Sequence, residues 1–419
     1  MSEAQRPAEE KLATSQPTPL TESSERLYYR DSFLREFDAQ VISCEKEGER
    51  WRVLLDRTAF YPTSGGQPFD TGKLGDVPVI EVADVEHKVV HYTSAAIPVG
   101  PVHGTIDWPR RIDHMQQHTG QHLLSAVFIE LFGFQTVSFH LGKEISTIDL
   151  ATPTVKIEHL EAAERRVNEV IFEDKPVVIR FGTAEELAEA GIRKKVEREG
   201  ILRAIEVEGF DRQPCGGTHL ERTGQAGTLL IRKLERRRDQ CRVEFLCGSR
   251  ALAQARKDFT TLTQAVSLLS CGIEELPAVL GKTLEERRVQ HGAVKKLEER
   301  AAEHQARWLL AARPAAEALR VIAASIEDAT PSYLDLLAAK LVAEANVVAL
   351  LASRATGHVV FAQTKGMAQD MGALLRETLK QFGGKGGGAK DFAQGSVADS
   401  AKVQDMIDQA RKAVAANLD

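Results

Sequence analysis

Two pairs of potential metal ligands constrain the fold of this chain more than any other feature. His118 and His122 are separated by three residues, and Cys215 and His219 repeat that spacing much further along the chain. Both pairs can serve one ion only if the fold brings the two segments together. Imidazole and thiolate groups are borderline-soft ligands that suit Zn²⁺. The sequence therefore predicts one Zn²⁺ ion per chain, held by these four residues.

The local sequence supports each pair differently. Helical spacing of apolar residues over 112–132 places both histidines on one helix face, because residues four apart are neighbours there. The second pair follows Pro214 in a glycine-rich turn that lets the backbone fold closely around an ion. Thr119 stands where zinc peptidases carry their general-base Glu, so peptide hydrolysis is not expected. The alternative, ordinary core or surface side chains, is disfavoured by the match of two pairs, while a structural and a catalytic ion both stay open.

Composition excludes several classes of protein. The chain has 419 residues, of which 43% are hydrophobic and 27% charged, as in soluble globular proteins of several domains. No run approaches the roughly 18 to 20 apolar residues of a membrane helix, and residues 1–25 lack the apolar core of a signal peptide. We therefore expect a cytoplasmic protein with no membrane partner.

Charge and cysteine content narrow the expectation further. The formal net charge is −6, so nucleic acid would have to be bound by local basic patches in an acidic background. The five cysteines are sparse and odd in number, which does not indicate a disulfide framework. We expect reduced thiols.

Shifts in pattern predict an α+β multidomain protein. Short extended runs separated by Gly, Asp and Pro indicate strands at 40–44, 51–55 and 88–92, whereas mixed patterns indicate strands at 136–139 and 145–150 and a helix at 157–172. The glycine run 383–388 is expected to be a loop. The segments are a disordered tail (1–25), a β-barrel-like domain (26–107), an α/β zinc domain (108–250), a helical hairpin or stem (251–313) and a small α/β domain (314–419).

Several motifs together resemble one known family. The motif His-Thr-x-x-His-Leu-Leu from His118 and the motif Cys-Gly-Gly-Thr-His from Cys215 resemble the editing domain of alanyl-tRNA synthetases and of the free-standing AlaX proteins. Residues 60–72 resemble the glycine-rich segment ahead of that domain, and residues 242–248 resemble its closing strand. Residues 383–395 resemble the C-terminal domain of alanyl-tRNA synthetase, called DHHA1.

This resemblance covers nearly the whole chain after the tail, and it implies a function. Too few residues precede the β-rich segment for an ATP-using aminoacylation core, so the chain is similar to the long AlaX type. The implied activity is that of an aminoacyl-tRNA deacylase that edits in trans without aminoacylation. Its substrate would be tRNA(Ala) carrying a non-cognate amino acid, serine or glycine. A second hydrolytic site is needed because a pocket sized for alanine excludes such competitors only weakly.

The resemblance also suggests site residues. Thr119 carries the hydroxyl expected to sense a seryl hydroxyl or to place the attacking water, which makes it a candidate catalytic residue. Ser138 is expected to bind substrate and His140 to act in catalysis, because both lie on the strand that would form the pocket wall. Ser138 and His140 could equally be ordinary polar residues of a strand.

Two segments are candidate tRNA contacts. Arg236, Arg237 and Arg238 lie in a basic run that could grip acceptor-stem phosphates, although charge runs are often only solvated faces. Lys385, Gly386 and Gly387 lie in the glycine run that the resemblance places near the tRNA elbow. Residues 389–391 read Ala-Lys-Asp where family members commonly have Arg-Pro-Asp.

Other interpretations remain open. Residues 65–67 read Gly-Gly-Gln, the tripeptide with which release factors cleave peptidyl-tRNA, but the β-rich context favours a turn or coincidence. A non-catalytic tRNA-binding or partner-binding protein could retain the same fold, and a related hydrolase could act on another ester or another tRNA. The C-terminal domain and its helical stem could support a homodimer.

Overall fold

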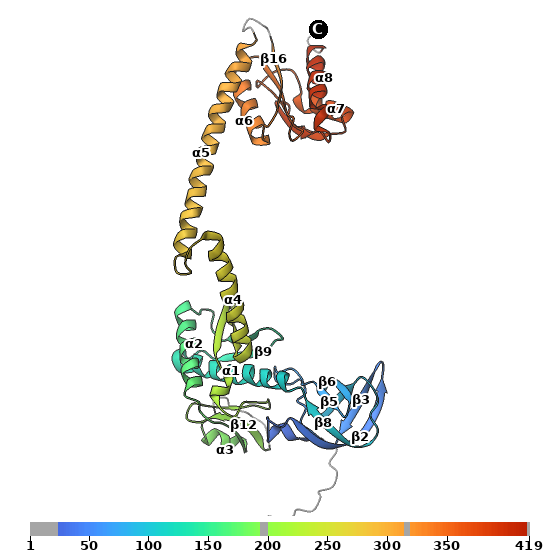
Figure 1. Ribbon diagram of the computed structural model, residues 1–419, viewed down its shortest axis with the longest axis vertical. Coiled ribbons are helices and arrows are strands. Elements are labelled where there is room, and N and C mark those ends of the chain that lie inside the picture. The colour runs from blue at the N-terminus through green and yellow to red at the C-terminus, as the bar shows by residue number, and fades with distance from the viewer. Residues whose placement is uncertain (1–23, 193–199, 314–318, 417–419) are drawn as a thin grey trace, which may run out of the picture. The chain divides into compact units, whose positions relative to one another are not determined.

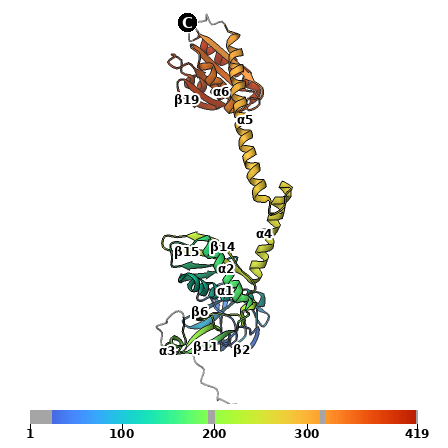
Figure 2. The same cartoon turned by 90° about the vertical axis from the view of Figure 1, so that its left-hand side faces the viewer.

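The computed structural model describes residues 24–192, 200–313 and 319–416, so nearly all of the tail expected over 1–25 lies outside the described residues. The chain forms two compact units, Met1–Gln264 and Ala265–Asp419 (Figure 1 and Figure 2). All five cysteines are in the described ranges and are free thiols, as expected. Within these ranges no helix is both long and apolar enough to cross a membrane.

The N-terminal strands form a closed antiparallel ring. Each strand pairs with the next, and the last pairs back with the first. In ring order the strands are β2 (Glu36–Glu47), β3 (Arg50–Leu55), β7 (Lys88–Thr93), β6 (Val77–Val85), β5 (Gly72–Leu74) and β8 (Gly100–Ile106). Alternate side chains of β2 are buried in the apolar interior, namely Phe37, Ala39 and Val41. Strand β1 (Glu25–Arg26) and the 3₁₀ turn Leu27–Tyr29 precede the ring, and β1 pairs in parallel with β4 (Arg57–Thr58), which follows β3 in the chain.

A mixed α and β region follows the ring in the same unit. One sheet has the order β14 (Leu229–Arg236), β15 (Cys241–Cys247), β10 (Ser146–Leu150) and β9 (Thr136–Leu141). A second sheet consists of β11 (Val177–Gly182), β12 (Leu202–Val207) and β13 (Asp211–Pro214). The helices are α1 (Trp108–Phe132), α2 (Ile157–Phe172) and α3 (Ala184–Glu189), with a 3₁₀ turn at Thr223–Ala226. The predicted helix over 157–172 is confirmed at both ends.

Helix α1 is the central element of this region. Its first turn is capped by Asp107, whose side chain accepts a hydrogen bond from the Arg110 amide, and its end is Gly133 in a left-handed conformation (φ 70°). Almost every residue from His114 to Phe128 is buried. A helix enclosed on most sides can present polar residues to an interior site, and both histidines of the first ligand pair lie in this stretch.

Two long helices follow, and after them comes a five-stranded sheet with further helices packed on it. The helices are α4 (Gly248–Leu269) and α5 (Leu276–Ala311). The sheet has the order β16 (Arg320–Ile326), β17 (Val347–Ser353), β18 (His358–Gln363), β20 (Phe392–Ser396) and β19 (Lys385–Gly388). The boundary between the two units lies within α4, so the expected hairpin of α4 and α5 stays a prediction.

Strand β17 separates the two cores of the C-terminal unit. Val347, Ala349 and Leu351 pack with α5 and α6 (Pro331–Val342), whereas the intervening Val348 and Leu350 pack with α7 (Met371–Gln381) and α8 (Val403–Ala416). Because successive side chains of a strand point to opposite faces, helices cover both faces of this sheet. The strand therefore reads as a continuous apolar run.

The loop expected over 383–388 is wrong for residues 385–388, because these form the edge strand β19. A Cβ atom at Gly386 would lie 2.6 Å from the Cα of Gly395, and one at Gly388 would lie 2.4 Å from the Cα of Ala393. These glycines are needed where β19 approaches β20 closely. A Cβ atom at Gly387 would meet only Arg376, at 3.8 Å, so this glycine is not required by packing.

Candidate metal centre and substrate cavity

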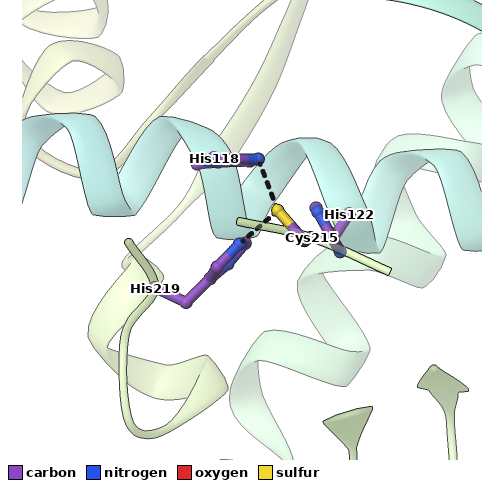
Figure 3. A group of neighbouring side chains, drawn as sticks. All are labelled: His118, His122, Cys215 and His219. Atoms are coloured by element: carbon purple, nitrogen blue, oxygen red, sulfur yellow. Dashed lines mark hydrogen bonds between the residues drawn. The ribbon is translucent and has the colours of Figure 1, made fainter. Parts of the chain in front are cut away.

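The four predicted metal ligands converge on one point (Figure 3). His118 and His122 extend from α1, while Cys215 and His219 lie in the segment that follows β13. The potential ligand atoms of all four residues lie within 4.8 Å of one another. Sγ of Cys215 is 3.4 Å from Nε2 of His118 and 3.3 Å from Nε2 of His219. Two segments far apart in sequence thus form one cluster.

These distances fit a four-coordinate ion. With bonds of about 2.3 Å to sulfur and about 2.0 Å to nitrogen, a tetrahedral site separates its sulfur and nitrogen ligands by about 3.5 Å. The cluster shows nearly this separation, and its donor set of one thiolate and three imidazoles is typical of transition-metal sites. The residues present therefore fit a metal ion.

Burial controls the protonation of the ligands. It lowers the pKa of His118 to about 3, and it holds the pKa of His219 well below the ordinary range. Both imidazoles are therefore neutral at physiological pH and keep a lone pair for a metal. Burial raises the pKa of the Cys215 thiol, an effect that the nearby Arg203 guanidinium partly opposes. A bound cation would favour the thiolate in the same way.

Arg203, on β12, supports the turn that carries Cys215. Its side chain is buried, and its Nη1 donates hydrogen bonds to the carbonyls of Cys215 (2.7 Å) and Gly217 (2.9 Å). Its Nε donates to the carbonyl of Tyr29 at 2.9 Å. A Cβ atom on Gly217 would lie 2.2 Å from the His118 ring, so the turn can pass the ligand only with glycine there. The arginine and the glycine together fix the path of the second ligand segment.

Thr119 lies behind the metal centre. It is 1% exposed, and its hydroxyl oxygen accepts a hydrogen bond from the amide of Leu220 and lies 3.2 Å from Nδ1 of His219. Thr119 does not line the cavity beside the metal centre. The structure therefore brings Thr119 to the candidate ligand His219 and not to the cavity wall.

A cavity of about 360 Å³ opens beside the ligands, which is within the usual size range of small-molecule sites. Three of the four ligands, His118, His122 and Cys215, belong to its wall. The rest of the wall comes from α1, from β9, from the end of β13 with the turn after it, and from the segment between β4 and β5. It includes Gln121, Ser138, Phe139, Gln213, Gly217, Tyr61 and Gly65. The segment between β4 and β5 and the candidate metal ligands thus line the same cavity.

Of the two residues expected on the pocket wall, the structure places only Ser138 there. Its hydroxyl donates to Oδ2 of Asp149 at 2.6 Å, and Asp149 is held in turn by Arg242 at 2.7 and 2.8 Å. The Arg242 hydrogen bonds lower the pKa of Asp149, which stays ionised. His140 is exposed on the same strand and does not line the cavity.

The predicted tRNA contacts are all exposed or half-buried but lie in different units. Arg236, Arg237 and Arg238 are exposed at the turn between β14 and β15, where Arg237 pairs with Glu235 at 3.3 Å. Lys385 and Gly386 are exposed and Gly387 is half-buried on the edge strand β19 of the C-terminal unit. The first three candidates therefore belong to the N-terminal unit and the last three to the C-terminal unit.

Sequence reasoning missed two residues of the metal centre. Arg203 lies on β12 between Leu202 and Ala204, and a charged residue between apolar neighbours is a sequence signal of a buried role. Gln67 belongs to the Gly-Gly-Gln tripeptide, for which the sequence alone favours a turn or a coincidence. It is fully buried and contacts both His118 and Thr218. Only the fold could place it, because the two segments are distant in sequence.

Two family models match the chain. The model described as the DHHA1 domain matches residues 318–416. The model described as the threonyl and alanyl tRNA synthetase second additional domain matches residues 202–244, which include Cys215 and His219.

Relatives match over most of the chain. The alanyl-tRNA editing protein AlaX-L of Pyrococcus horikoshii is 30% identical over 415 residues, which cover 94% of this chain and 99% of the relative. The alanyl-tRNA editing protein Aarsd1 of Danio rerio is 35% identical over 263 residues, 59% of this chain and 64% of the relative. The alanine–tRNA ligase of Pyrococcus abyssi is 30% identical over 400 residues, 91% of this chain but 43% of the ligase. With nearly end-to-end similarity to AlaX-L, this chain belongs to the family of alanyl-tRNA editing proteins.

Proposed function

We propose that this protein hydrolyses the ester bond of tRNA(Ala) that carries serine or glycine, acting in trans and without aminoacylating tRNA. The observation that carries the proposal is a cavity of about 360 Å³ whose wall includes three of the four metal ligands. An aminoacyl ester is already activated, so orientation and charge stabilisation suffice for its hydrolysis. Family membership supports the choice of tRNA(Ala).

The ion that we propose for the cluster is Zn²⁺, one per chain, held by His118, His122, Cys215 and His219. When bound, it would order one wall of the cavity and stabilise negative charge on the ester. Arg203 holds the backbone carbonyls on either side of Gly216, which keeps Cys215 directed at the cluster. The hydrogen bonds of Arg203 therefore maintain the position of Cys215 in the cluster.

Ser138 is the residue that we place in contact with the aminoacyl group. Because its proton is donated to Asp149, its oxygen keeps lone pairs that can accept from an ammonium or hydroxyl group of the substrate. We infer that Thr119 acts indirectly, by positioning His219, since it does not line the cavity. His140 does not line the cavity, and this proposal gives it no part in the reaction.

Binding of the tRNA is proposed for two surfaces. Arg236, Arg237 and Arg238 would contact the acceptor-stem phosphates, and Lys385 with Gly386 and Gly387 would contact the elbow. Phosphate contacts of this kind give affinity that falls with salt. A homodimer through the C-terminal domain and a cytoplasmic location stay predictions.

A second function follows from one specific observation. All four ligand residues converge, and an ion with four protein ligands has no open position, as in structural zinc sites. A protein that only binds tRNA or a partner would need the ion for structure alone and no open coordination position. The two functions differ in whether the metal-loaded protein releases the amino acid.

The deciding experiment measures hydrolysis of Ser-tRNA(Ala), Gly-tRNA(Ala) and Ala-tRNA(Ala) by the purified protein, with zinc content determined on the same sample. We expect loss of the seryl or glycyl ester, with the alanyl ester spared. Cys215→Ser should lower both zinc content and activity, whereas the matched control Cys271→Ser, a free thiol outside the cluster, should change neither. A zinc-loaded sample that binds tRNA but spares all three esters would favour the binding function.

A further inference from the structure

Gln67 reaches into the metal centre from the segment between β4 and β5. Its Oε1 lies 2.8 Å from Nδ1 of His118 and accepts a hydrogen bond from the amide of Thr218 at 3.2 Å. Its Nε2 donates to the hydroxyl of Thr218 at 2.8 Å. Gln67 and Thr218 are fully buried, so these bonds do not compete with water. The side-chain amide of Gln67 thus links the segment between β4 and β5 to α1, which carries His118, and to the turn between Cys215 and His219.

These contacts determine which nitrogen of His118 carries the proton. A backbone amide can only donate, so the atom of Gln67 that faces the Thr218 amide must be the carbonyl oxygen. The same oxygen faces Nδ1 of His118, and that nitrogen must therefore carry the hydrogen. The neutral ring then keeps its lone pair on Nε2, which points toward Sγ of Cys215 at 3.4 Å. The hydrogen bonds of Gln67 therefore select the tautomer of His118 whose Nε2 is available to a metal ion.

We propose that Gln67 is a positioning residue of the metal centre, which fixes the tautomer and the orientation of His118. The segment between β4 and β5 is then part of the metal site and not only a neighbour of the cavity. This inference rests on the proposed metal centre. It assigns to Gly-Gly-Gln a role in ligand orientation instead of a direct part in ester cleavage.

The two glycines explain how Gln67 reaches this position. Gly65 and Gly66 both have positive φ, 53° and 85°, and the backbones of Ser64 and Gln67 exchange hydrogen bonds of 3.1 and 2.9 Å across the turn. A Cβ atom on Gly66 would lie 2.9 Å from the carbonyl oxygen of Phe139. Only glycine allows this tight turn against β9. The turn aims the amide of Gln67 at His118.

The first test is zinc affinity, measured by competition with a chelator. Partners of metal-ligating histidines typically contribute about 10-fold to 100-fold in affinity. We expect Gln67→Met, which keeps the length but loses the acceptor, to weaken zinc binding within that range. Gln67→Glu retains an acceptor for Nδ1–H and should stay within about threefold of the unchanged protein.

A matched control separates orientation from loss of folding stability. Gln117, on α1, is buried like Gln67. Its side chain makes two hydrogen bonds with the backbone of Cys247, at 2.8 and 3.0 Å, and none of these bonds involves a residue of the cluster. Gln117→Met should lower the melting temperature about as much as Gln67→Met, but it should leave zinc affinity unchanged. Equal losses of affinity in both variants would overturn the proposal.

The second test needs neither metal nor activity. Nitrogen NMR of the metal-free protein distinguishes Nδ1–H from Nε2–H in His118. We expect Nδ1–H in the unchanged protein and a mixture in Gln67→Met. Nε2–H in the unchanged protein would overturn the inference about Gln67. Absence of zinc binding with Nδ1–H present would instead count against the proposed metal centre.

Discussion

Asp70 and Arg111 form an ion pair from which solvent is fully excluded. Nε of Arg111 lies 3.0 Å from Oδ2 of Asp70, and both side chains have no exposed surface. Arg111 also donates to the carbonyls of Ser32 (2.9 Å) and Ala59. Because Arg111 lies in the first turn of α1, this pair connects the segment between β4 and β5 to the helix that carries His118 and His122.

Removal of Arg111 should destabilise the protein strongly. Arg111→Met leaves the Asp70 carboxylate buried without a partner charge, which typically costs about 3 to 5 kcal/mol. The measurement is the free energy of unfolding in urea. The exposed pair Arg222–Asp174 is the matched control, and Arg222→Met should cost less than about 1 kcal/mol. Similar costs for the two variants would contradict the prediction.

Much of this molecule could be predicted from local sequence. The helix over 157–172 and the group of four candidate metal ligands depend on spacing along one or two short segments, which sequence displays directly. Strand β19 could not be predicted, because its glycines are required by the close approach of the β20 backbone across the sheet, which the local sequence does not show. Gln67 and Arg203 could not be assigned either, since their partners lie more than ten residues away and only the fold brings them together.

Thr119 shows how a correct helix can still mislead. Successive residues of a helix are rotated by about 100°, so the residue after His118 faces a different direction from the ligand itself. In the structure that direction leads to His219 and Leu220 instead of the cavity. Adjacency to a candidate ligand in sequence therefore did not place the hydroxyl on the cavity wall.

Replacing Thr119 tests its indirect role. Thr119→Val removes the hydroxyl partner of the Leu220 amide and of His219 in a buried site, which should cost about 1 to 3 kcal/mol of stability. We expect weaker zinc binding and an equal loss of seryl and glycyl ester hydrolysis, and Thr119→Ser should restore most of both. A loss confined to the seryl ester would instead support direct sensing of the seryl hydroxyl.

Ser138 and His140 should respond differently to the same substitution. Ser138→Ala removes an oxygen from the cavity wall, and the loss of one substrate hydrogen bond of about 1 kcal/mol corresponds to about a fivefold fall in kcat/KM. His140→Ala should leave kcat/KM within about twofold, because His140 does not line the cavity. Hydrolysis of Ser-tRNA(Ala) under single-turnover conditions checks both. A larger fall in kcat/KM for His140→Ala than for Ser138→Ala would contradict this prediction and support a role of His140 in catalysis.

The basic turn between β14 and β15 predicts a particular salt dependence. Arg236 and Arg238 are exposed, and the ion pairs found among residues 24–192, 200–313 and 319–416 do not include them. Each of Arg236→Ala and Arg238→Ala should weaken tRNA(Ala) binding and lower the slope of log affinity against log salt by about 1. Arg288→Ala, an exposed arginine in the C-terminal unit that pairs with Glu285, is the control. An unchanged slope in the first two variants would mark the turn as a solvated face.

His91 should make the ring sensitive to acid. It is fully buried, with Nε2 2.8 Å from the Thr58 hydroxyl, and burial lowers its pKa to about 4 from an ordinary 6.5. Between these two values only the unfolded chain takes up the proton, so the stability that depends on neutral His91 is present above pH 6.5 and is lost as the pH falls toward 4. The loss attributable to His91 between pH 7.5 and pH 5 should be about 2 kcal/mol.

His91→Gln removes this titration, although it also lowers stability at every pH. Urea unfolding of the two proteins across the pH range isolates the effect, because other buried histidines contribute equally to both. The free energy of unfolding should fall less steeply in the variant, by about 2 kcal/mol over that interval. Parallel pH profiles would show that His91 is protonated as readily in the folded ring as in the unfolded chain.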